Sequence, residues 1–180
     1  MHRHIRARRR SALTNYRKRM ALLKGGLPRL VLRRSNRTIT MQIISYRPDG
    51  DIVLASASSR ELAKEGWPAR ANVPTAYLTG LVLARKAREL KERRVVLDVG
   101  LYKPVKSSVV FAGAKGAADG GIEVLNGIEI DAKRLSGEHI SNYAKSIKDD
   151  ARQFSSYRKD KIDVSSIHTL FESVKRKIAA

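Results

Sequence analysis

The sequence predicts a mixed α/β fold, in which an antiparallel strand meander and a parallel strand share one sheet that helices cover. Three strand-like runs, at 28–34, 38–47 and 52–58, follow one another closely. A long segment of helical periodicity then leads to a short apolar strand at 95–99, which Gly100 ends. A strand reached through a crossover helix lies parallel to its partner. This arrangement also allows one face of the sheet to stay uncovered.

The chain length suits one domain with extensions, because about 180 residues can bury a substantial core. We expect a basic N-terminal arm and helix at 1–26, an α/β core at 27–148 and a C-terminal helical extension at 149–180. The absence of cysteine favours a reducing compartment. The N-terminus lacks the apolar run of a signal peptide, and no later run reaches membrane-spanning length. These features predict a cytoplasmic protein.

The N-terminal segment predicts an arm followed by a helix. Residues 1–10 hold five arginines and few apolar side chains, so we expect them to become ordered only on a partner. Ser11 is suited to cap a helix, and apolar residues then recur at helical spacing. Gly25 and Gly26 are a stop signal, which ends the predicted helix at residue 24.

The three strand-like runs predict a meander with one polar and one apolar face. Pro48, Asp49 and Gly50 favour a turn that joins the second and third runs as an antiparallel hairpin. Strict alternation along the first run turns its leucines toward the core and puts Arg29 and Arg33 together on the opposite face.

The later elements are predicted mainly from helical spacing. We expect one or two helical turns at 59–65, a long crossover helix at 75–93, a helix of small residues at 107–119 with glycines after it, a short strand at 128–130, and helices at 136–148 and 166–177.

Charge is distributed unevenly along the chain. The sequence has 37 basic and 17 acidic side chains, a net charge of +20. The first acidic residue is Asp49, and 14 basic residues precede it, whereas the remainder carries only +6. Such an excess implies a polyanionic partner. We therefore expect the N-terminal quarter to neutralise phosphates while the rest of the chain folds.

Arginine dominates this basic segment, and its planar guanidinium binds phosphate through two donors at once and can stack on bases. Tyr16 could stack on an unpaired base, but it also fits the apolar periodicity of its helix, so a core role is equally open. The candidate RNA-binding residues are Arg8, Arg9, Arg10, Asn15, Tyr16, Arg17, Arg19, Lys24, Arg29, Arg33, Ser35, Asn36 and Arg37.

Catalytic interpretations of the sequence find less support. The four histidines lack convincing metal-ligand spacing, and the glycines at 113–121 do not form a phosphate-binding loop. A metal-dependent ribonuclease using Asp98, which ends a strand, is one alternative. A simpler interpretation is that Asp98 hydrogen-bonds the following loop. Another alternative is a nonspecific basic nucleic-acid chaperone. We expect no cofactor, no metal, no small-molecule substrate and no membrane association.

Several segments in one fixed order resemble the archaeal and eukaryotic branch of the universal large-subunit ribosomal protein L-eighteen family. The resemblance covers residues 6–146 and is specific because the segments are separate and collinear. They are TNYRKRMALLKGGLPRLVLRRSNRTITMQI, GDIVLASASSREL, GWPARANVPTAYLTGLVLARKA, VVLDVGL, VFAGAKGAADGGIEV and SGEHISNYA.

The resemblance implies a non-catalytic protein that binds 5S rRNA and helps to anchor it in the central protuberance of the large subunit. It further implies 23S rRNA and the ribosomal protein of the L-five family as neighbours. The family's RNA contacts carry over onto the matching positions Arg8, Arg9, Arg10, Asn15, Arg17, Arg19, Lys24, Arg33, Ser35, Asn36 and Arg37.

Overall fold

A five-stranded mixed sheet forms the centre of the molecule, and the computed structural model describes residues 14–125, 130–147 and 152–179. The strand order is β3-β2-β1-β4-β5. β1 pairs with β2 and β2 with β3 in antiparallel fashion, whereas β1–β4 and β4–β5 are parallel. The predicted mixed fold is therefore confirmed. The strands are β1 (Arg29–Arg34), β2 (Ile39–Ser45), β3 (Ile52–Ser58), β4 (Arg94–Asp98) and β5 (Glu123–Leu125).

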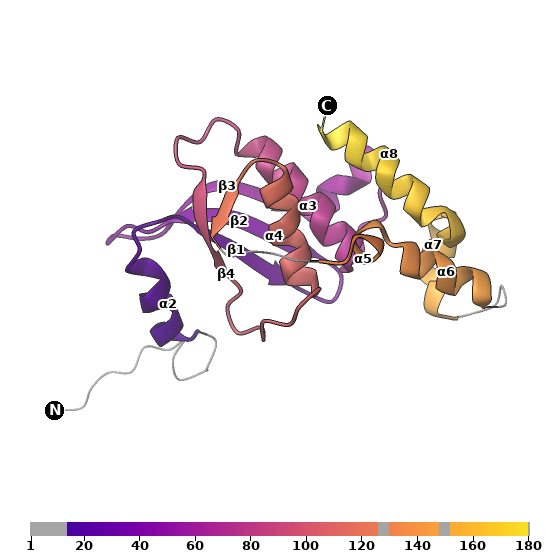
Figure 1. Ribbon diagram of the computed structural model, residues 1–180, viewed down its shortest axis with the longest axis horizontal. Helices are drawn as coiled ribbons and strands as arrows, with labels where there is room; N and C mark the ends of the chain where they lie inside the picture. Colours follow the sequence, from indigo (N-terminus) through magenta and orange to yellow (C-terminus); the bar gives the residue numbers. More distant parts are fainter. Residues whose placement is uncertain (1–13, 126–129, 148–151, 180) are drawn as a thin grey trace.

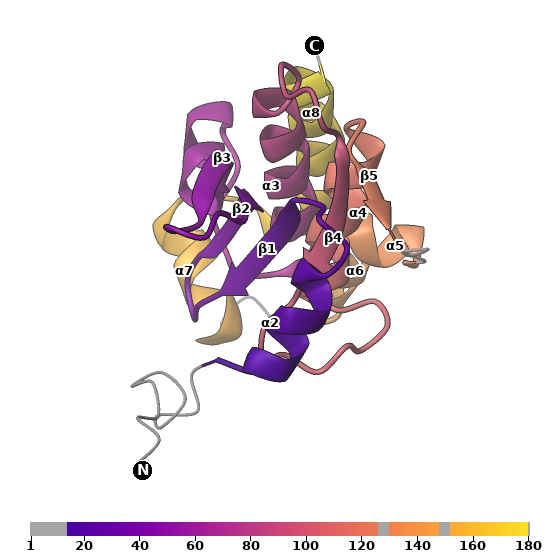
Figure 2. The same ribbon diagram turned by 90° about the vertical axis from the view of Figure 1, so that its left-hand side faces the viewer.

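Helices form layers on the sheet (Figure 1). α3 (Val73–Lys86) and α4 (Val109–Asp119) cover one face, and α2 (Tyr16–Leu23) lies on the opposite face, in front of β1 and β4 in Figure 2. The remaining helices are η1 (Ser59–Glu65), α5 (Ala132–Ser136), α6 (Glu138–Ser146), η2 (Arg152–Phe154), α7 (Ser155–Lys159), η3 (Val164–Ser166) and α8 (Ile167–Ala179).

Alternation along the central strands produces the core. Leu30 and Leu32 of β1 and Ile39, Met41 and Ile43 of β2 are at most 1% exposed, and they point toward α3 and α4. Burying each such side chain stabilises the fold by about 1.5–3 kcal/mol. The predicted turn joins β2 to β3. The face assigned to the leucines of β1 is confirmed.

α3 and α4 approach so closely that glycine is required between them. A Cβ on Gly116 would lie 2.0 Å from the carbonyl oxygen of Tyr77, and one on Gly80 would lie 2.3 Å from that of Gly113. The small residues that the sequence analysis assigned to a helix therefore bring two backbones into direct contact.

Two predicted helices have different boundaries in the structure. The helix expected at 11–24 corresponds to α2, which begins at Tyr16, because the side chain of Asn15 accepts a hydrogen bond from the Lys18 amide and caps it; residues 11–13 lie outside the described part. The crossover helix spans 73–86 rather than 75–93. Asn72 caps its start, and its end is displaced because the chain must return to the sheet, where β4 begins at Arg94 and pairs with β1.

The region between α4 and the C-terminus also differs from the prediction. The helix expected at 136–148 is interrupted by Gly137, whose φ of 80° is left-handed and separates α5 from α6. The expected strand at 128–130 falls mostly outside the described residues, and β5 forms earlier, parallel to β4. The helices η2, α7 and η3 were not predicted.

The C-terminal helix α8 matches its prediction within two residues at each end, and it packs on α3. Phe171 contacts the ring of Trp67 edge to face at 6.0 Å and that of Tyr77 at 5.7 Å. The indole of Trp67 donates a hydrogen bond to Thr75 at 2.8 Å. α8 lies on the side of α3 that faces away from the sheet (Figure 1).

Candidate nucleic-acid interface

The sheet face opposite α3 and α4 carries charged side chains from neighbouring strands. The pairing register places Arg33 of β1 beside Thr40 of β2, and Val31 of β1 beside Asp98 of β4. Residues paired across a ladder point to the same face. Arg29 shares this face with Arg33 because the two lie four residues apart on one strand. The predicted grouping of these two arginines is thus confirmed, but Asp98 lies with them.

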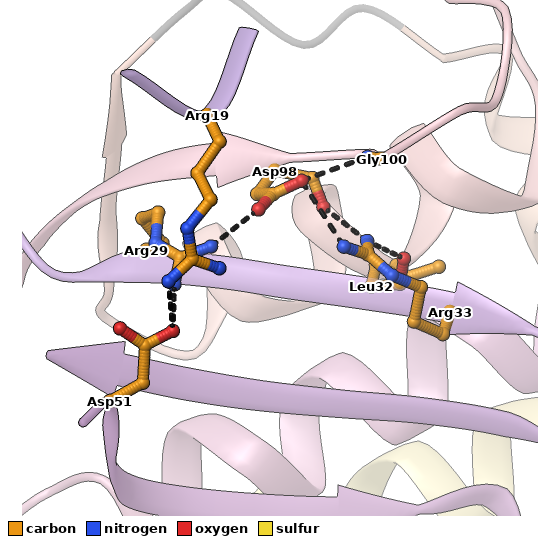
Figure 3. Close-up of polar contacts among 7 residues, drawn as sticks. All are labelled: Arg19, Arg29, Leu32, Arg33, Asp51, Asp98 and Gly100. Atoms are coloured by element: carbon orange, nitrogen blue, oxygen red, sulfur yellow. Dashed lines mark hydrogen bonds and ion pairs between the residues drawn. The ribbon is translucent and has the colours of Figure 1, made fainter. Parts of the chain in front are cut away.

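Arg29 is buried at the centre of an ion-pair network (Figure 3). Its guanidinium donates to Asp98 through Nη1 and to Asp51 through Nη2, both at 2.7 Å. Only 3% of its side chain is exposed. Asp98 is the last residue of β4, and Asp51 lies in the turn before β3. Arg29 therefore connects β1 to both elements. In this structure Arg29 holds elements together and is not presented to solvent.

The same network holds α2 against the sheet. Arg19 of α2 donates to the Asp51 oxygen that also accepts from Arg29, at 2.7 Å (Figure 3). The side chain of Arg19 is one-third exposed. A short helix of eight residues is marginal by itself in water. The contact with Asp51 therefore helps to fix the position of the cations on α2.

Arg33 is also fixed, but it remains accessible. Its Nη1 donates to the carbonyls of Leu32 and Asp98 at 2.8 and 2.9 Å, and its Nη2 donates to the Asp98 carboxylate at 3.3 Å. The Gly100 amide donates to the same carboxylate at 2.8 Å. The side chain of Arg33 is 46% exposed. The guanidinium is therefore preorganised at the surface of the site.

The Asp98 carboxylate is kept ionised by these donors. Burial disfavours its charged form and raises its pKa, but the Gly100 amide and the Arg33 and Arg29 guanidinium groups outweigh burial. The net result is a pKa below the ordinary value for aspartate. The simpler prediction for Asp98, a hydrogen bond to the following loop, is confirmed.

Replacing Asp98 by asparagine is expected to lower the free energy of unfolding by about 3 kcal/mol at neutral pH, because the buried Arg29 loses its one buried carboxylate partner. A carboxyl whose folded pKa is depressed stabilises the fold above its unfolded pKa, about 3.9, and this contribution is lost as pH falls through the folded pKa. The difference between wild type and variant should therefore shrink below about pH 4. Urea unfolding at neutral pH and at several pH values down to about 3 measures it.

The exposed aspartate Asp49, in the turn after β2, provides the matched control for this titration. Asp49→Asn should unfold like the wild type at each pH. A deficit for Asp98→Asn that is equal at neutral and acidic pH would contradict the electrostatic role of Asp98.

Several predicted RNA-binding residues lie around this network and are free of ion pairs within the described residues. Arg17 and Lys24 are exposed on and just after α2. Ser35, Asn36 and Arg37 form the exposed turn between β1 and β2, where the Ser35 hydroxyl accepts from the Thr38 amide at 2.9 Å. Lys18 and Arg34 are further exposed cations that the prediction omitted.

The other predicted positions have mixed outcomes. Asn15 is exposed and serves as the cap of α2. Tyr16, the first residue of α2, is half-buried and lines a cleft of about 370 Å³ together with Tyr46 and Met20. Both of its predicted roles therefore remain open. Arg8, Arg9 and Arg10 lie outside the described residues.

Sequence reasoning missed Asp51 and the loop at 101–106. Asp51 follows the predicted turn, where an acidic residue looks like an ordinary solvated charge. Leu101 and Val105 in the loop are 59% and 58% exposed, next to Lys103 and Lys106. Large apolar side chains exposed between lysines are the signal that would have identified this loop.

The structure gives no support to a metal centre. Within the part of the chain that the structure describes, no three His, Asp or Glu side chains gather to hold a metal ion. Asp98, the residue considered for nuclease chemistry, is paired with arginines. None of the described helices is long and apolar enough to cross a membrane.

Comparison with known proteins shows similarity over nearly the whole chain. Residues 2–92 match the family described as ribosomal large subunit proteins 60S L5, and 50S L18. The large ribosomal subunit protein uL18 of Methanococcus maripaludis is 42% identical over 178 residues, 95% of this chain and 92% of the relative. The protein of the same name from Thermofilum pendens is 44% identical, and the match covers 95% of this chain and 91% of the relative. That from Korarchaeum cryptofilum is 42% identical, with 96% and 92% covered.

Proposed function

Because this chain belongs to the family of large-subunit ribosomal proteins that contains archaeal uL18, we propose that it binds 5S rRNA and helps to anchor it in the central protuberance. Family membership makes the protein a structural component of the large ribosomal subunit, a cytoplasmic particle, and not an enzyme. The alternative of a metal-dependent ribonuclease using Asp98 was therefore wrong.

One observation supports the RNA-binding proposal most strongly: exposed cations gather around the sheet face opposite α3 and α4, the face on which α2 lies. Those of α2 and of the β1–β2 turn, such as Arg17, Lys24 and Arg37, extend from elements that Arg19 and Arg29 fix in place. Cations carried on rigid elements bind phosphates without the cost of ordering the backbone that holds them. The interface therefore suits a folded RNA with closely spaced phosphates.

The proposal assigns different roles to the predicted residues. Arg17, Arg19, Lys24, Arg33 and Arg37 neutralise phosphates, together with Arg8, Arg9 and Arg10 of the arm. Ser35 and Asn36 contact sugar hydroxyls or bases. Arg29 acts indirectly because it is buried. We also infer that 23S rRNA and the L-five family protein are neighbours of this protein in the subunit.

A variant with four surface cations replaced by alanine tests the proposal in the intact chain. Arg17, Lys18, Lys24 and Arg37 are exposed and make no ion pair with a described residue, so their replacement should leave the fold intact. We expect the affinity for a 5S rRNA transcript to fall roughly tenfold or more at physiological salt. The slope of log K against log salt should decrease by about 0.7–0.9 for each phosphate that the variant no longer neutralises. Filter binding at several salt concentrations measures both.

The matched control removes two arginines and two lysines from the opposite side, at Arg60, Lys64, Arg176 and Lys177. This control should keep its affinity within about twofold, because distant exposed charges are screened. Equal decreases in the two variants would mean that net charge alone drives binding, as in a nonspecific chaperone. A duplex DNA competitor distinguishes the same two cases, since a chaperone would bind it as tightly as 5S rRNA.

A further inference from the structure

A cleft of about 490 Å³ opens between α2 and the loop that follows β4. One wall is formed by Asn15, the cap of α2, and by Lys18 and Leu22 of the helix. The opposite wall is formed by Leu101 and Tyr102. The floor is the end of β1 and β4, where Arg33 lies over Gly100. A cleft of this volume is within the range that holds a molecule as large as a nucleotide.

The walls of this cleft combine apolar surface with positive charge. Leu101 is 59% exposed and Tyr102 is 38% exposed, which leaves apolar surface open to solvent beside the cleft. Lys18 lies on the rim, and Lys103 follows Tyr102 directly. Proteins that bind unpaired nucleotides stack bases on aromatic or guanidinium planes and neutralise the flanking phosphates with cations.

Two groups in the cleft are already held in place for a ligand. Three N–H donors of Arg33 are used in its hydrogen bonds to Leu32 and Asp98, which leaves two of the five donors of a guanidinium. A Cβ on Gly100 would lie 3.0 Å from the guanidinium carbon of Arg33, so the absence of a side chain there is what admits this arginine. The hydroxyl of Tyr102 donates a hydrogen bond to the Arg34 carbonyl and fixes its ring.

Negative charge in the cleft does not oppose a phosphate. Asp98 on the floor is 7% exposed, and its carboxylate accepts from two arginines and one backbone amide. Its charge is thus compensated locally, and the cations on the rim set the potential that a ligand meets.

We propose that this cleft binds one unpaired nucleotide of the RNA, with the base against Tyr102 and Leu101 and the flanking phosphate beside Lys18. The inference rests on the proposed binding of 5S rRNA and specifies one position within it. A base held there would be extruded from its helix. The protein would therefore bind a bulge or loop of the RNA in preference to a regular duplex.

Two substitutions in the same loop provide the sharpest test. Leu101 and Val105 are equally exposed, but only Leu101 lines the cleft. Leu101→Glu and Val105→Glu add the same charge to the same loop and leave the core unchanged. Chemical probing of a 5S rRNA transcript with the full chain should show one unpaired nucleotide that the wild type protects. This protection should disappear with Leu101→Glu and remain with Val105→Glu.

A tyrosine pair supplies an independent measurement. Tyr102→Ala should weaken 5S rRNA binding by about 5- to 150-fold, the usual effect of removing one base–aromatic contact. Tyr143 of α6 is the control, because it is also exposed and its hydroxyl is likewise hydrogen-bonded, as the acceptor from Gln153. Tyr143→Ala should bind 5S rRNA as the wild type does.

The outcomes separate this inference from the proposed function. If the wild type does not bind the 5S transcript, the proposed function fails. If the wild type binds but the footprint of Leu101→Glu and the affinity of Tyr102→Ala are unchanged, only the nucleotide cleft is overturned. Unchanged RNA binding with impaired binding to the L-five family protein would also overturn it, since the cleft would then receive a peptide segment.

Discussion

Gly116→Ala is expected to destabilise the protein by about 3 kcal/mol, at the upper end of the range for overpacked cores. The added Cβ would lie 2.0 Å from the Tyr77 oxygen, 2.8 Å from its carbonyl carbon and 3.0 Å from its Cα. All three atoms belong to the backbone of α3, so no side-chain rotation can relieve the clash, and the two helices must move apart. Urea denaturation followed by circular dichroism measures the decrease in stability.

Gly25→Ala is the control for this substitution. Gly25 follows α2, and a Cβ there would meet only the Leu22 oxygen, at 4.0 Å. The control should therefore change the free energy of unfolding by less than about 1 kcal/mol. Wild-type stability for Gly116→Ala would show that α3 and α4 do not pack backbone to backbone. Gly116→Ala should still bind 5S rRNA in proportion to its folded fraction, since Gly116 is remote from the cations of α2 and the β1–β2 turn.

Arg29→Lys is expected to lower the free energy of unfolding by about 3 kcal/mol, although it keeps the charge. One guanidinium reaches Asp98 and Asp51 in two directions at once, whereas a single ammonium at the end of a flexible chain cannot maintain both contacts. One of the two carboxylates, Asp98 or Asp51, would then be left without this partner. We also expect faster amide hydrogen exchange in α2, because Asp51 would hold Arg19 less firmly.

Arg34→Lys, an exposed position on the same strand, is the matched control and should be neutral within about 0.5 kcal/mol. If Arg29→Lys unfolds like this control, the network would be dispensable for stability. A decrease in stability without faster exchange in α2 would restrict the role of Arg29 to the sheet.

β1 to β4 were predicted well because their signals are local, whereas β5 was not predicted. Leu30 and Leu32 alternate with Arg29, Val31 and Arg33, and the proline–glycine turn lies between two apolar runs, so a short window of sequence contains the pattern. The helix ends were predicted poorly. Helical periodicity continues past Lys86 to Leu90, but the helix stops earlier, because the chain has to return to the edge of β1. The interruption at Gly137 depends in the same way on the packing of neighbouring elements.

The amino-acid sequence alone determined that positive charge is concentrated before Asp49 and that Arg29 and Arg33 share one face of a strand. Only the tertiary structure decided which arginines meet solvent. Arg29 is buried because Asp51 and Asp98, 22 and 69 residues away in sequence, lie 2.7 Å from it in space. An ion pair depends on the distance between two charges in the folded chain. The number of residues between two charges does not determine their distance in the fold, whereas alternation along a strand follows directly from the order of residues.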